Sequence, residues 1–116
     1  IAAFILSSCA ASPEQMAMQA EYNRTIPTCS NENQCKIMWE SAQIWISNNT
    51  GYRIQTATDA VIQTFGPIGY STNLAARISK EPTGQNSYRF PIFLGCANAF
   101  GCIPNAMKSA IQFNAC

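Results

Sequence analysis

Six cysteines are the residues of this 116-residue chain with the clearest chemistry, and the chain contains no histidine. Five residues separate Cys29 from Cys35, and five separate Cys96 from Cys102. Zinc knuckles and thiol oxidoreductases space their cysteines more closely, and a zinc site without histidine would need four thiolates. The spacing therefore predicts structural disulfides, with Cys29, Cys35, Cys96 and Cys102 as candidate partners, and no metal ion or other cofactor. Many pairings of six cysteines remain open on spacing alone.

Enzymatic activity is not expected. The absence of histidine removes the commonest general base at neutral pH and every Ser-His or Cys-His nucleophile pair. The six acidic residues are scattered, without a pair that suggests two carboxylates facing a substrate. We therefore predict no catalytic residue. A net charge of +1 also gives no long-range field to attract nucleic acid, which we do not expect as a partner.

The first residues suggest export. Six cysteines in a short chain are typical of an oxidising compartment. An apolar run, Ile1–Leu6, is followed by the small residues Ser7 and Ser8 and then by Cys9. This order is typical of the end of a secretory signal peptide. We therefore expect residues 1–8 to be the remnant of a signal peptide.

Leu6-Ser7-Ser8-Cys9 resembles the lipobox of bacterial lipoproteins, in which the cysteine becomes the first mature residue and carries lipid. The resemblance covers these four residues and the apolar run before them. It implies lipidation of Cys9 and a membrane partner bound through that anchor. The small, uncharged segment that follows, residues 10–12, implies sorting to the outer membrane of a Gram-negative bacterium, with the protein facing the periplasm. The rest of the chain resembles uncharacterised envelope lipoproteins of such bacteria.

The alternative is a secreted, disulfide-rich inhibitor or effector without lipid. Lipidation of Cys9 would leave five cysteines and so one free thiol, for which Cys116 is the candidate. In the secreted form all six cysteines would be paired, with Cys9–Cys116 as one possible bridge. We expect the first form, a non-enzymatic envelope lipoprotein that serves as a binding or structural module at the outer membrane.

Local signals predict a first and a last helix. Ser12 is a suitable N-cap, Pro13 suits the first helical position and Gln15 completes a capping box, for a helix that ends near Tyr22. Pro104 can open the last helix. The apolar face expected for that helix comprises Ile103, Met107, Ala110 and Ile111.

A longer second helix is predicted from a cap at Ser30 or Asn31 to about Ser47. Its apolar stripe comprises Cys35, Met38, Trp39, Ala42, Trp45 and Ile46. Because both tryptophans lie on this stripe, we expect them in the core rather than in a sugar-binding site. Ile37 and Ile44 lie on the opposite side, where either the first helix covers them or they are exposed to a partner, and we prefer coverage by the first helix.

From Tyr52 onward the apolar residues recur with period two, which predicts strands. The predicted strands are residues 52–58, 60–66, 73–80 and 87–95. Short turns, including one at residues 81–84, make them an antiparallel meander. Pro91 places the last strand at an edge. The prediction is a two-layer α+β fold with helices on one face of a four-stranded sheet, and with residues 9–29 as an N-terminal tether and short helix before a compact domain at 30–116.

The other face of the sheet is a candidate binding surface. Its expected side chains are Arg53, Gln55, Gln63, Arg77 and Arg89. Three arginines on one face could bind a carboxylate or phosphate of an envelope protein or glycan. A face that is simply solvated is the preferred interpretation, because antiparallel sheets ordinarily expose polar side chains on one side.

The loop between Gly95 and Cys102 is a candidate recognition element. It carries Asn98 and Phe100 between paired glycines and cysteines. A braced loop with an aromatic tip can bind a partner. We prefer the alternative in which Phe100 is buried beneath the last helix, because phenylalanine is usually buried.

Overall fold

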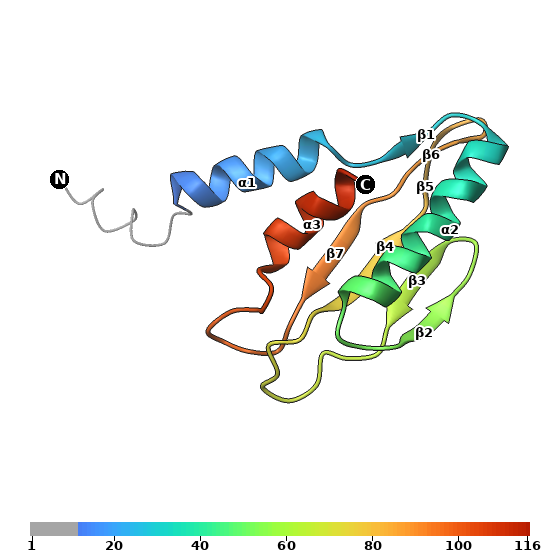
Figure 1. Cartoon of the computed structure of the whole chain (residues 1–116). Helices are drawn as coiled ribbons and strands as arrows, with labels where there is room; N and C mark the ends of the chain where they lie inside the picture. Colours follow the sequence, from blue (N-terminus) through green and yellow to red (C-terminus); the bar gives the residue numbers. More distant parts are fainter. Residues whose placement is uncertain (1–11) are drawn as a thin grey trace.

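The computed structural model describes residues 12–116, so the predictions for residues 1–8 and for Cys9 lie outside the described part of the chain. Its helices are α1 (Pro13–Arg24), α2 (Glu32–Asn49) and α3 (Ala106–Asn114). Its strands are β1 (Thr28–Cys29), β2 (Ile54–Ala57), β3 (Val61–Thr64), β4 (Ala75–Ser79), β5 (Glu81–Gly84), β6 (Ser87–Arg89) and β7 (Ile92–Gly95). They form an antiparallel sheet of order β2-β3-β4-β7 and a smaller one of order β1-β6-β5 (Figure 1).

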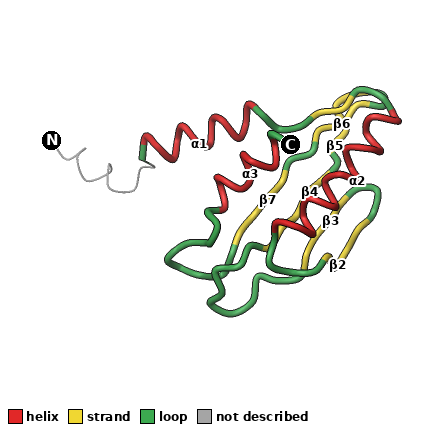
Figure 2. Tube along the Cα trace, viewed as in Figure 1, coloured by secondary structure: helices red, strands yellow, loops and turns green. Residues whose placement is uncertain are grey.

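The predicted α+β class and the four-stranded sheet are confirmed. Both α2 and α3 lie over one face of that sheet (Figure 2). On this inner face Ile62 pairs with Ile78, which pairs in turn with Ile92, and all three side chains are buried. Ile46 of α2 is fully buried in the same cluster. The core therefore lies between the helices and one sheet face.

Helix α2 forms as its cap and stripe predict. The Asn31 side chain accepts a hydrogen bond from the Gln34 backbone N–H, which caps the helix. Trp39 packs against Phe90 at a ring-centroid distance of 5.6 Å, and Trp45 meets Phe113 of α3 edge-on at 5.1 Å. Both tryptophans thus pack in or against the core, as expected.

Helix α1 has the predicted capping box but no buried residue, and it packs against α3. The Tyr22 hydroxyl donates a 2.7 Å hydrogen bond to the Ile92 carbonyl, and Asn114 of α3 donates to the Tyr22 carbonyl. Burial raises the pKa of the Tyr22 phenol, which favours its protonated, donating form. Since α1 lies on α3, it does not cover α2, and Ile37 and Ile44 are 55% and 63% exposed. The prediction that α1 covers them is wrong.

The predicted strand at 87–95 is two strands in different sheets. It breaks at Phe90-Pro91, between β6 and β7. Residues 81–84, predicted as a turn, form β5, and the chain reverses into β6 through Gln85-Asn86, where Asn86 has a positive φ of 58°. Pro91 therefore lies between two strands rather than inside one, and the predicted edge position holds only for β7, because β6 is the middle strand of the smaller sheet.

Two predicted boundaries also differ in the structure, namely the end of the N-terminal tether and the start of the last helix. Cys29 is 3% exposed and is bonded to Cys35 of α2, so the chain through Cys29 belongs to the core rather than to a separate tether. Helix α3 begins after Pro104, with Asn105 as its N-cap, because the Asn105 side chain accepts from a backbone N–H of the first turn. Ile103 lies outside the helix and is 72% exposed.

Candidate binding surface

Two disulfides brace the described part of the chain. Cys29–Cys35 and Cys96–Cys102 are both formed, so the four predicted partners pair locally. Cys116 is exposed, and no cysteine among the described residues is bonded to it. Within residues 12–116 no group of three or more acidic, cysteine or histidine side chains could hold a metal ion. None of the described helices is long and apolar enough to cross a membrane.

On the sheet face opposite the helices, two of the predicted polar residues meet. Arg77 of β4 pairs in register with Gln63 of β3, and Arg77 Nη1 donates to Gln63 Oε1 at 3.1 Å. Across the other strand boundary Arg77 pairs with Phe93 of β7, whose ring is 71% exposed. This face thus offers a cation beside an aromatic ring.

A hollow of about 370 Å³ adjoins Arg77. Ala75 and Gly95 are register partners in β4 and β7, and their small size leaves the space open. Its other principal lining residues are Gln63, Pro67, Arg77 and Phe93. No acidic side chain lines the hollow, so Arg77 has no competing carboxylate there.

The other predicted members of this face are dispersed. Arg53 stacks over the Phe65 ring at 5.5 Å and does not line the hollow. Gln55 lies at a bulge in β2, where it is exposed and has no register partner. Arg89 lies on β6 of the smaller sheet, where its Nε is 2.8 Å from Glu81 Oε1. The break at Phe90-Pro91 separates Arg89 from the others, so the expected cluster of three arginines does not form.

The loop of residues 96–105 is braced with its aromatic tip outward. Asn98 Nδ2 donates to the Tyr70 carbonyl at 2.7 Å, and Asn98 Oδ1 accepts from the Phe100 backbone N–H at 2.9 Å. The Cys96–Cys102 disulfide closes the loop. These bonds hold Phe100 fully exposed, away from α3, so the preferred prediction of a buried Phe100 is wrong.

Three further exposed apolar residues accompany Phe100, and the sequence analysis missed them as a group. They are Ile68, Tyr70 and Ile103, and together with Phe100 we call them the apolar edge. Ile103 donates its backbone N–H to the Thr72 carbonyl, which together with the Asn98 bond to Tyr70 ties the two loops side by side.

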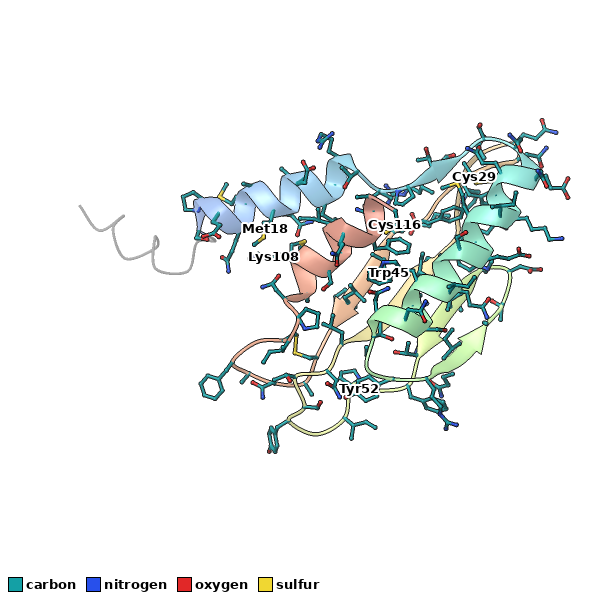
Figure 3. All side chains as sticks on the ribbon, in the orientation of Figure 1. Met18, Cys29, Trp45, Tyr52, Lys108 and Cys116 are labelled. Carbon is teal, nitrogen blue, oxygen red and sulfur yellow. A yellow bond between two sulfur atoms is a disulfide. The ribbon has the colours of Figure 1, made fainter. Side chains whose placement is uncertain are left out.

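Tyr52 holds the loop that carries Ile68 and Tyr70 through a hydrogen bond. The Tyr52 hydroxyl accepts a hydrogen bond from the Ile68 N–H at 3.1 Å, and Figure 3 shows Tyr52 at this end of the molecule. A Cβ at Gly66 would lie 2.9 Å from the Tyr52 ring, so glycine is needed for this close approach. A signal for the apolar edge was present in the sequence, because residues 60–76 and 90–107 contain no charged side chain.

Comparisons with known proteins give no relative. No protein-family model, curated protein or solved structure matches the chain.

Proposed function

We propose that this protein is a non-enzymatic lipoprotein of the cell envelope, held at the outer membrane by acyl chains on Cys9. It presents a disulfide-braced binding module to the periplasm. The observation that carries the proposal is the distribution of the cysteines. Four pair locally, Cys116 has no disulfide partner within residues 12–116, and Cys9 is the cysteine of the lipobox-like segment.

The geometry of α1 disfavours the secreted alternative, which needs a Cys9–Cys116 bridge. Helix α1 has 12 residues, so it separates Ser12 from the opposite helix end by about 18 Å. Cys116 lies near that opposite end, beside Pro27, and Figure 1 marks the C-terminus there. Three residues of extended chain reach about 10 Å, and a disulfide adds a Cα–Cα distance of about 7 Å at most. The combined reach of about 17 Å is slightly less than the length of α1, so an intact α1 disfavours a bridge from Cys9 to Cys116.

The intact mass of the protein from its natural host tests the proposal. We expect a mature protein that begins at Cys9 and carries several hundred daltons of lipid, because a protein needs more than one acyl group for durable membrane binding. Cys9→Ala should release the protein from the membrane fraction, whereas the control Cys116→Ala should stay there. A chain that lacks lipid and is lighter by about six daltons, from three disulfides, would contradict the proposal and favour the secreted form.

For the ligand of this module, we propose a carboxylate or phosphate group of an envelope glycan, bound in the hollow beside Arg77. Arg77 is exposed and touches only the neutral Gln63 among the polar side chains near it. A guanidinium can bind either anion through two parallel hydrogen bonds. Phe93 adds an apolar ring against which a sugar can pack.

Retention on purified peptidoglycan tests this ligand. Arg77→Ala should weaken binding by about tenfold or more, since a charge-assisted hydrogen bond contributes roughly 1.5–3 kcal/mol. Arg89→Ala is the matched control, because it removes the same charge from the other sheet. Equal retention of the parent and both variants would exclude the hollow as the peptidoglycan site.

A further inference from the structure

The apolar edge is the most prominent unassigned surface of the described chain. Ile68, Tyr70, Phe100 and Ile103 are 65%, 88%, 101% and 72% exposed. They lie on two loops joined by hydrogen bonds, within stretches that carry no charge. Clustered exposed apolar side chains of this kind mark a surface that meets a protein or a membrane.

The loop that carries Phe100 lies at the same end of the molecule as the start of α1. A groove of about 710 Å³ is lined by Gln15 and Met16 on one side and by Gly101 and Cys102 on the other. The loop that carries Phe100 is therefore next to the first turns of α1. In Figure 1 α1 begins at the left of the molecule, and the two loops lie below it, at the lower left and bottom. In the sequence, the chain before Ser12 reaches Cys9 after three residues.

We propose that the apolar edge inserts into the headgroup boundary of the membrane that holds the Cys9 anchor. This inference rests on the proposed lipidation. Tyrosine and phenylalanine are suited to that boundary, where an apolar ring and a polar hydroxyl are both accommodated. The absence of charge in both loops matters because insertion would then desolvate no ion.

The edge and the anchor would act together. Four partly inserted side chains bind a bilayer weakly by themselves, but an anchor at the same end makes their contact intramolecular and raises its effective concentration. Two points of attachment instead of one would also fix the orientation of the domain relative to the membrane. A lipid surface is favoured over a protein partner because the proposed Cys9 anchor would already hold this end of the domain at the membrane.

Tryptophan reporters on vesicles test the inference. In a Cys116→Ala chain whose two disulfides are intact, the one remaining thiol, Cys9, is coupled to a maleimide phospholipid. This places every variant on vesicles of phosphatidylethanolamine and phosphatidylglycerol, whether or not Cys9 is acylated in the cell. Phe100→Trp and Tyr70→Trp report from the edge. Ile37→Trp is the matched control, because it is an exposed apolar position on α2, away from these loops.

The readout is quenching of tryptophan emission by brominated lipid, with Trp39 and Trp45 as a background common to all variants. We expect the reporters at positions 100 and 70 to be quenched several-fold more than the one at position 37, with emission moved to shorter wavelength. Quenching no stronger than at position 37 would overturn the inference. That result would leave the proposed lipidation intact, since the mass of the natural protein tests it separately.

Discussion

Replacement of Phe90 by alanine is expected to lower the free energy of unfolding by about 3–5 kcal/mol, the usual range for removing a buried aromatic ring. Phe90 is 1% exposed and packs against Trp39 of α2. Its backbone N–H donates to the Pro27 carbonyl, at the point where the chain passes from one sheet to the other. A cavity there would loosen both sheets against α2. Urea denaturation followed by circular dichroism measures the loss.

Phe93→Ala is the control for this prediction. Phe93 lies three residues further along the chain, on the outer face of the sheet, and is 71% exposed. Its replacement should change the free energy of unfolding by no more than about 0.5 kcal/mol, as is usual for an exposed site. Similar losses for the two variants would mean that Phe90 is not part of the core packed against α2.

Removal of the Cys29–Cys35 disulfide by alanine at both positions is expected to cost about 2–4 kcal/mol of stability. Chain entropy accounts for about 2 kcal/mol of this, because the bridge closes a short loop. The remainder comes from burial, since both half-cystines are 2–3% exposed and the bridge holds β1 against α2. Thermal unfolding without reductant measures the effect.

The Cys96–Cys102 pair provides a matched comparison. Its sequence separation is the same, so the entropic contribution is the same, but neither residue lies in the buried core. Its removal should cost about 2 kcal/mol and should speed amide hydrogen exchange mainly within residues 96–105. Equal losses for the two double variants would show that burial of Cys29 and Cys35 adds nothing beyond loop closure.

Local chemistry made part of the candidate surface predictable. The placement of Gln63 and Arg77 on one sheet face followed from strands with a period of two, and the braced loop followed from the spacing of Cys96 and Cys102. Whether Phe100 points inward or outward depends on Asn98 and Tyr70, which are 28 residues apart in the chain. Hydrogen bonds over that separation leave no periodic signal in a sequence.

The amino-acid sequence by itself determined the helix cap at Ser12, a cap at Ser30 or Asn31 for α2, the apolar stripe of α2 and the α+β class. These features depend on neighbours within one or two turns or on a strict repeat. Only the tertiary structure decided that residues 87–95 belong to two sheets, that Arg89 faces Glu81 and that α1 packs on α3. In each case several partners satisfied the local pattern equally well, and packing against distant parts of the chain selected one of them.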